Sequence, residues 1–276
     1  SDVTVARHGD DSFMVMSGTS HTRRDHDHLR RHIRDGEDVR LRDVTTSYAV
    51  LAIAGPNSPR LLGAVTDADL SDDAFPPYRM RHTHIGHAPV FAQRLSFTGE
   101  TGWEIFVTPD FAEHVLDDIL EAGQPLGLRL AGGEALNALR IEKGFLHWGA
   151  DMAYTDAPYQ LGLDFICKRG KTLPFIGQDA CLARKADPKG PCLRSVRLAD
   201  PDAILHHNEP VLRDGQIIGF VTSGAFCAMQ KAAVGLCLVS PPDGAGGFEA
   251  VDDGPCSVMV EGREVPAELR RKPFSA

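Results

Sequence analysis

The sequence lacks the features that mark several protein classes. Its 276 residues contain no apolar run of about 18 residues, so no membrane-spanning helix is predicted, and residues 1–5 do not read as a signal peptide. Basic residues are outnumbered, 29 against 38 acidic ones, which gives a net charge of −9. A nucleic-acid binder is disfavoured, because phosphate contacts need a basic surface. The ordinary apolar (42%) and charged (24%) shares exclude a disordered, collagen-like or coiled-coil chain.

Cysteine is scarce and confined to the second half of the chain. The six cysteines begin at Cys167 and form no CxxC pair, so we expect small buried thiols rather than a disulfide framework. A reducing compartment follows, the cytoplasm or, in a eukaryote, the mitochondrial matrix. Walker, GxSxG and HExxH motifs are absent. Residues 244–249 resemble a dinucleotide loop only in part and predict a turn.

Histidine clusters suggest metal sites but carry little weight. His28 and His32 have the i, i+4 spacing of a zinc protease, yet Leu29 stands where that motif needs glutamate. Arginines surround them, so a solvated helix face of mixed charge is the preferred interpretation. His82 and His84 share one face of a predicted strand, and there too a metal site is the weaker interpretation.

The order of predicted elements changes near residue 190. The first part alternates strands and helices in small α+β units; strands are expected over residues 2–7, 13–16, 39–44, 47–54, 79–85, 88–97 and 103–108, and helices over 19–33, 111–122 and 131–143. Short β runs between Gly- and Pro-rich turns follow, typical of a barrel or sandwich. Residues 184–191 read as a linker. We therefore expect domains over 1–187 and 188–276.

One turn combines glycines with a carboxylate in a way that favours ligand binding. In the stretch TGETGWE, residues 98–104, the glycines permit close backbone approach. An ionised Glu100 could accept two parallel N–H bonds from a planar amino-heterocycle. For Glu100 alone an ordinary β-turn acid is the commoner outcome, and Glu104 is expected to face solvent.

Further motifs follow in a characteristic order. They are Arg-Ile-Glu at 140–142, Trp-Gly-Ala-Asp at 148–151, Phe-Ile-Gly at 175–177 and Val-Thr-Ser-Gly at 221–224. Together with the 98–104 turn, they make the chain resemble the folate-dependent aminomethyltransferase family, the T-protein of the glycine cleavage system and its relatives. Segments 138–144, 147–149 and 164–166 are most similar to the folate domain of dimethylglycine and sarcosine dehydrogenases or oxidases.

The resemblance implies an α+β aminomethyltransferase-like fold, a mixed α/β folate-binding part followed by a small all-β barrel. It also implies that a piece of the family fold preceding residue 1 is missing from this chain. A separate chain, or a cleaved N-terminal portion carrying a flavin domain, is expected to supply that piece. A flavoprotein subunit with FAD is therefore an expected partner, whereas nucleic acid and membrane are not.

The resemblance also implies the chemistry. The family transfers a one-carbon unit to tetrahydrofolate, which needs a carboxylate beside the reacting nitrogens and exclusion of water. Asp2 falls on the family's catalytic aspartate, and Glu100 is expected to hold the pterin edge. Arg140 would line the folate site by hydrogen bonds and Trp148 by packing. Ser17 stands where the T-protein has asparagine.

The implied function is tetrahydrofolate-dependent transfer of a methylene or methyl group from an N-methylated amine such as dimethylglycine or sarcosine, as part of an oxidative demethylase. Three alternatives stay open from the residues: a flavin-independent methyltransferase acting on a sulfonium, amine or aryl ether; a non-catalytic folate-binding or assembly subunit; and a hydrolase with Ser1 as N-terminal nucleophile.

Overall fold

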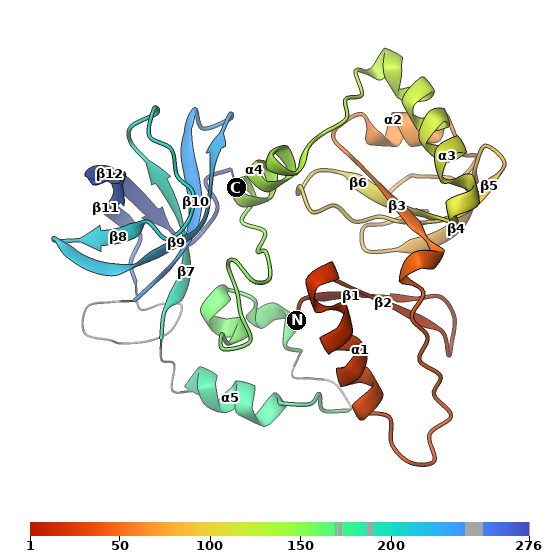
Figure 1. The fold of residues 1–276 in the computed structure, drawn as a ribbon, viewed down its shortest axis with the longest axis horizontal. Coiled ribbons are helices and arrows are strands. Elements are labelled where there is room, and N and C mark those ends of the chain that lie inside the picture. The colour runs from red at the N-terminus through yellow and green to blue at the C-terminus, as the bar shows by residue number, and fades with distance from the viewer. Residues whose placement is uncertain (169, 171–172, 187–189, 241–250, 276) are drawn as a thin grey trace. The chain divides into compact units, whose positions relative to one another are not determined.

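The computed structural model describes residues 1–168, 170, 173–186, 190–240 and 251–275. The chain forms two compact units, residues 1–131 and 132–276 (Figure 1). The element order begins β1 (Val3–Arg7), β2 (Phe13–Ser17), α1 (Thr22–Arg31), β3 (Ala49–Ala54), α2 (Ser58–Gly63), β4 (Met80–Ile85), β5 (Ala88–Gln93), β6 (Gly102–Val107) and α3 (Pro109–Gly123). Unit two contains α4 (Gly133–Glu142), α5 (Gln178–Ala186), β7 (Cys192–Leu198), β8 (Pro210–Arg213), β9 (Gln216–Cys227), β10 (Ala232–Val239), β11 (Gly254–Val260) and β12 (Arg263–Arg270).

The core of the first unit is a four-stranded antiparallel sheet in the order β3-β6-β5-β4. Alternate residues of its strands point to one face and form a core with α2 and α3. Helix α3 begins with proline at its first turn and buries Val115 and Ile119, four residues apart on one stripe. The opposite face of the sheet carries the register pairs Phe91–Phe106 and Gln93–Glu104.

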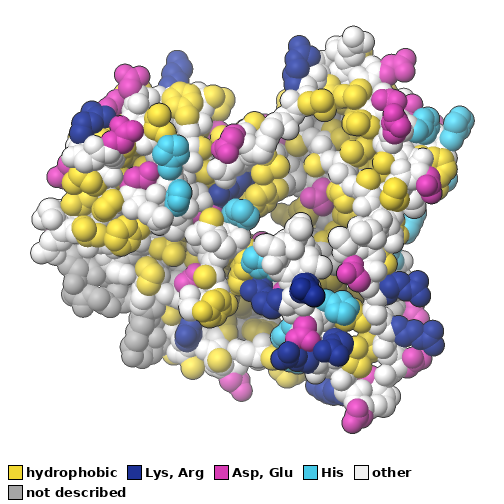
Figure 2. All heavy atoms as spheres, viewed as in Figure 1, with side chains coloured by type: hydrophobic (Ala, Val, Ile, Leu, Met, Phe, Trp, Pro, Cys, Tyr) yellow, Lys and Arg dark blue, Asp and Glu magenta, His cyan; other side chains and the backbone are white. Residues whose placement is uncertain are grey.

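The chain enters this unit through the antiparallel hairpin β1–β2, which leads to α1. Helix α1 buries none of its residues. Asp27 pairs with both Arg30 and Arg31 along its surface, and Figure 2 shows basic, acidic and histidine side chains gathered over it. The predicted mixed-charge face is confirmed, and the His28 and His32 rings simply lie beside each other on it.

The second unit is built on a closed barrel, with strand order β10-β7-β12-β11-β8-β9. Its interior is filled by inward-facing aliphatic side chains and two cysteines, Cys192 and Cys237, and the partly buried Cys256 packs against them. A second apolar cluster joins α4 and the segment after it to β9 and β10. Thus α4 packs on the barrel rather than standing apart from it.

Most predicted elements are present, with informative differences. Residues 39–44 form no strand: Val39 and Leu41 alternate correctly, but they are exposed and have no partner strand. Strand β12 was not predicted, although Val265, Ala267 and Leu269 alternate inward. Residues 184–186 of the expected linker belong to α5, while 187–189 and the turn expected at 244–249 lie outside the described residues. The boundary after 187 stays a prediction.

Candidate active site

The turn before β6 is fastened closely to the loop after β3. Gly55 donates its backbone N–H to the Thr101 carbonyl at 2.9 Å, and the buried Ser58 hydroxyl is 2.7 and 2.8 Å from the carbonyls of Gly55 and Thr101. A Cβ on Gly102 would lie 2.5 Å from the Ile53 carbonyl oxygen, so only glycine fits there. These contacts fix the backbone that carries Glu100, whose exposed carboxylate faces Gly55.

Beyond that turn, four side chains share the sheet face that does not contact the helices. Gln93 on β5 is the register partner of Glu104 on β6, and Phe91 is the partner of Phe106. The two phenylalanine rings stack 4.3 Å apart. Tyr48 contacts both rings edge-on. A carboxylate and an amide therefore stand beside an aromatic cluster.

The two polar side chains of this face have limited access to water: Gln93 is buried and Glu104 is partly buried. Burial raises the pKa of the Glu104 carboxyl, and the Oε1 atom of the buried Gln93 has no hydrogen-bond partner among the described residues. On the other side of Glu104, β3 presents only the small, exposed Ala52. The face thus offers acceptors in an apolar setting, which suits a flat heterocycle with N–H donors.

The β1–β2 hairpin contributes a histidine to the same side of the sheet. His8 Nδ1 lies 3.3 Å from Nε2 of His82 on β4, and the His8 ring contacts Phe91 edge-on. Burial, and next the charge of His82, lower the pKa of His8. The neutral His8 ring therefore packs against the aromatic cluster.

The hairpin brings two of the predicted site residues to one end. Asp2 is exposed and immediately precedes Val3, whose register partner is Ser17. Asp25 of α1 lies at this end too, and Ser1 Oγ donates to its Oδ1 at 2.5 Å. Burial opposes ionisation of Asp25, but hydrogen bonds from Ser1, Arg24 and Ser17 outweigh it and lower the pKa of Asp25. Ser1 thus ties the start of the hairpin to α1.

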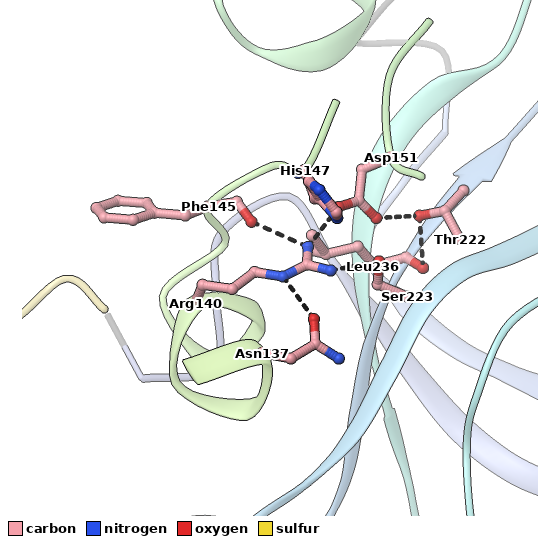
Figure 3. A network of polar contacts seen from close by, with 8 residues as sticks. All are labelled: Asn137, Arg140, Phe145, His147, Asp151, Thr222, Ser223 and Leu236. Carbon is pink, nitrogen blue, oxygen red and sulfur yellow. Dashed lines mark hydrogen bonds and ion pairs between the residues drawn. The ribbon is translucent and has the colours of Figure 1, made fainter. Parts of the chain in front are cut away.

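In the second unit, Arg140 is the centre of a buried polar network (Figure 3). Its side chain is 2% exposed and pairs through Nη1 with Asp151, which is 0% exposed. Nε donates to Asn137 at 2.9 Å, Nη1 to the Phe145 carbonyl at 3.1 Å and Nη2 to Ser223 Oγ at 2.7 Å.

Asp151 is satisfied on both of its oxygens. Oδ2 also accepts the backbone N–H of His147 at 2.9 Å, and Oδ1 accepts the Thr222 hydroxyl at 2.6 Å. The network therefore ties α4, the loop after it and β9 together. Trp148 lies between Arg140 and Asp151 in the sequence, and it packs against the cluster that joins α4 to the barrel.

A cavity of about 750 Å³ opens beside this network, lined in part by Asn137, Arg140, His147, Thr222 and Ser223. Among the described residues, no group of three His, Cys, Asp or Glu side chains could hold a metal ion. Within the same described part of the chain, no helix has the length and apolar character needed to cross a membrane.

Both halves of this chain match models of known protein families. The family model of the GCVT N-terminal domain matches residues 1–171, and that of the glycine cleavage T-protein C-terminal barrel domain matches residues 192–275. The chain belongs to the glycine cleavage T-protein family. The resemblance expected from the motifs is thereby confirmed.

Relatives of this T-protein family chain fall into two groups. It is 38% identical over 99% of its length to 4-methylaminobutanoate oxidase (formaldehyde-forming) of Paenarthrobacter nicotinovorans, and 35% identical over 100% to mitochondrial dimethylglycine dehydrogenase of Rattus norvegicus. It spans only 32% and 30% of those two proteins. It is 33% identical over 99% of its length to the aminomethyltransferase of Rubrobacter xylanophilus, of which it covers 68%.

The fold expectation is confirmed as well. The glycine cleavage system aminomethyltransferase T from Bartonella henselae superposes with a TM-score of 0.81 at 19% identity, over 99% of this chain and 71% of that one. At that identity the likeness speaks for the fold alone. The relatives are named as transferases, dehydrogenases and oxidases, in agreement with the expected enzyme class.

Within this T-protein family chain, the predicted site residues fall into three groups. Asp2 and Ser17 share the hairpin end, Glu100 lies on the glycine turn, and Arg140 and Trp148 belong to the second unit. The Glu104–Gln93 pair was missed. The sequence did carry a signal for it. Glu104 lies in the segment GWEIFV, whose other residues are glycine or apolar, whereas a strand with one face in solvent would carry polar residues at alternate positions.

Proposed function

We propose that this chain binds tetrahydrofolate and transfers a one-carbon unit from an N-methylated amine, as the folate part of an oxidative demethylase. The match of both family models, one over each half of the chain, carries the proposal. Relatives named for N-methylated amines, dimethylglycine and 4-methylaminobutanoate, support the donor class. Dimethylglycine and sarcosine remain the substrates we would test first.

The residues of the first unit fit a reduced pterin. The ring system carries an amino group and ring N–H groups on one edge, which would donate to Glu104 and to the unpartnered Gln93 Oε1. In an apolar setting such hydrogen bonds discriminate strongly, because a ligand without donors leaves both acceptors unpaired. Phe91 and Phe106 would exclude water beside them.

Bound tetrahydrofolate would supply the nitrogen nucleophile that accepts the one-carbon unit. The protein's own contribution is orientation, exclusion of water and a carboxylate near the developing positive charge. We assign that carboxylate to Asp2. Glu100 on its rigid turn would hold a further part of the pterin edge, and Ser17, the register partner of Val3, would position the hairpin end that carries Asp2.

Arg140 and Trp148 have a different relation to the ligand. The Arg140 guanidinium already donates four hydrogen bonds to protein groups. We therefore propose that it acts on the folate site indirectly, by fixing the position of the loop after α4. Trp148 would contribute to that site by packing.

Tetrahydrofolate titration into the protein, followed by calorimetry and by tryptophan fluorescence, tests the binding. Glu104→Gln should weaken binding about tenfold or more, since a charged hydrogen bond contributes about 1.5–3 kcal/mol. Glu100→Ala should also weaken it mainly at the binding step. Glu113→Gln, an exposed carboxylate on α3, is the matched control. Absence of any heat or fluorescence change in the wild type would refute folate binding.

Catalysis is tested separately. Asp2→Asn should abolish one-carbon transfer to tetrahydrofolate while leaving binding nearly intact, and Asp11→Asn in the hairpin turn should leave both unchanged. If Asp2→Asn retains full transfer, Asp2 is not the catalytic carboxylate.

A second candidate is a flavin-independent folate-dependent transferase, favoured by the 33% identity of this chain to a relative named as an aminomethyltransferase. The two candidates differ in their partners. We propose that the assembled protein contains further family sequence and an FAD-bearing subunit or portion. The intact masses of copurifying chains and a flavin absorption band would decide between the two. A cytoplasmic or mitochondrial-matrix location stays a prediction, although the dimethylglycine dehydrogenases are named as mitochondrial.

A further inference from the structure

Two cysteines outside the folate-binding proposal lie side by side in the second unit. Cys167 follows the 3-10 turn η5 (Asp164–Ile166), and Cys181 lies in the first turns of α5, the turquoise helix labelled in Figure 1. Their Sγ atoms are 3.8 Å apart. Both side chains are half-buried thiols, so a small solute can approach them.

The two segments that carry these thiols are already held together. Lys185 of α5 forms an ion pair with Asp164 of η5, and the thiols line a small crevice together with Phe175, Gln178 and Leu182 among others. The cysteines therefore face each other across a packed contact. A covalent link would shorten the Sγ–Sγ separation from 3.8 Å to about 2.05 Å.

The other thiols differ in a way that makes this pair selective. Cys192, Cys227 and Cys237 are buried, and burial raises the pKa of Cys256 to about 11. Because the thiolate is the reactive form, such thiols react slowly with oxidants. Only Cys167 and Cys181 combine partial exposure with a thiol neighbour at contact distance among the described residues.

We propose that Cys167 and Cys181 are a redox modification site that forms a reversible disulfide when exposed to hydrogen peroxide. One thiolate attacks a peroxide oxygen, the O–O bond breaks, and a sulfenic acid and water result. The second thiolate then attacks the sulfenic sulfur, the S–S bond forms, and a second water leaves. The two sulfurs lose two electrons and two protons in all, and the peroxide becomes two waters. A dithiol reductant reverses the reaction by thiol–disulfide exchange.

The disulfide would fasten α5 covalently to η5, in the place where Lys185 and Asp164 now hold them by charge. The proposal is independent of tetrahydrofolate binding, because no residue assigned to the folate site takes part. Its failure would therefore leave the proposed function untouched.

The test treats the native protein with hydrogen peroxide, alkylates the remaining thiols and digests with trypsin. We expect two of the six thiols to become unavailable, a cross-link between the tryptic peptides 144–168 and 172–184, and full recovery of six alkylatable thiols after dithiothreitol. Cys256→Ser should form the same cross-link. Cys167→Ser should not, and should instead leave a sulfenic acid on Cys181 that dimedone traps.

Two results would overturn the proposal. One is recovery of Cys167 and Cys181 as alkylated thiols, or as separate sulfonic acids, in peroxide-treated wild type. The other is a cross-link pattern spread over all six cysteines, as expected of a urea-unfolded sample run in parallel, because the folded contact would then confer no selectivity.

Discussion

Replacing Asp151 by alanine tests the energetic role of the buried network in the second unit. Asp151 and Arg140 are both almost fully buried and pair directly. The substitution removes the counter-charge and leaves the guanidinium without its carboxylate, while the Arg140 contacts to Asn137, Phe145 and Ser223 stay in place. The perturbation is thus confined to one charge and the groups that face it.

The expected loss is large. Removal of one partner of a buried ion pair costs about 3–5 kcal/mol, because the remaining charge stays desolvated. The backbone N–H of His147 and the Thr222 hydroxyl lose an acceptor as well. In a unit of this size each kcal/mol lowers Tm by about 3 °C. We therefore expect Tm of the second unit to fall by about 10–15 °C.

Urea and thermal unfolding, followed by fluorescence, measure this change. Trp148 packs in the apolar cluster next to the network and reports on the second unit, whereas Trp103 is buried in the core of the first. A Trp103→Phe background isolates the Trp148 signal. Calorimetry of the same variant should then show one transition moved and the other unchanged.

The double variant Arg140→Met with Asp151→Leu separates the cost of an unpaired charge from the contribution of the pair. Replacing both charges by apolar side chains removes the desolvated guanidinium, so much of the lost stability should return. A loss below about 1 kcal/mol in Asp151→Ala, or a double variant no more stable than the single one, would refute the reasoning.

Three further predictions concern the first unit. Burial raises the pKa of Glu104, so its ionised form destabilises the fold; Glu104→Gln should raise Tm at neutral pH, and the gain should vanish below about pH 4.3. Burial, and next the neighbouring His82, lower the pKa of His8. The neutral His8 ring should therefore make its full contribution to the stability of the first unit above about pH 6.5, and this contribution should be lost as pH falls through the lowered pKa. Thermal melts across this range should show a smaller loss in His82→Leu. A Cβ at Gly102 would meet a carbonyl oxygen at 2.5 Å, so Gly102→Ala should cost about 1–3 kcal/mol in urea unfolding; Gly63→Ala in the same unit, where a Cβ meets nothing within 4 Å, should cost less than half of that.

Local patterns predicted the elements well where a partner was available. The alternation in β6 and the i, i+4 spacing in α3 correspond to faces that pack on each other. Residues 39–44 show the limit, since the same alternation yields no strand when no neighbouring strand supplies hydrogen bonds. Barrel closure depends on pairings such as β12 with β7, which join residues far apart in the sequence.

The site was predictable by residue type more than by role. The motif at 98–104 located the glycine turn, but the strand register decides that Glu104 faces Gln93 in an apolar setting. Arg140 and Asp151 were both within recognised motifs. The hydroxyl groups of Thr222 and Ser223 that complete their bonding come from a strand 71 and 83 residues further along the chain, so the motifs alone could not show the burial of the pair.

The placement of this network affects how the protein can be dissected. Arg140 and Asp151 lie in the segment matched by the N-terminal family model, and their hydroxyl partners lie in the segment matched by the barrel model. Cutting the chain between the two matches would leave the Arg140–Asp151 ion pair on one fragment and the hydroxyl groups of Thr222 and Ser223 that bind it on the other. Chimeras between homologues should keep α4 and β9 from a single parent.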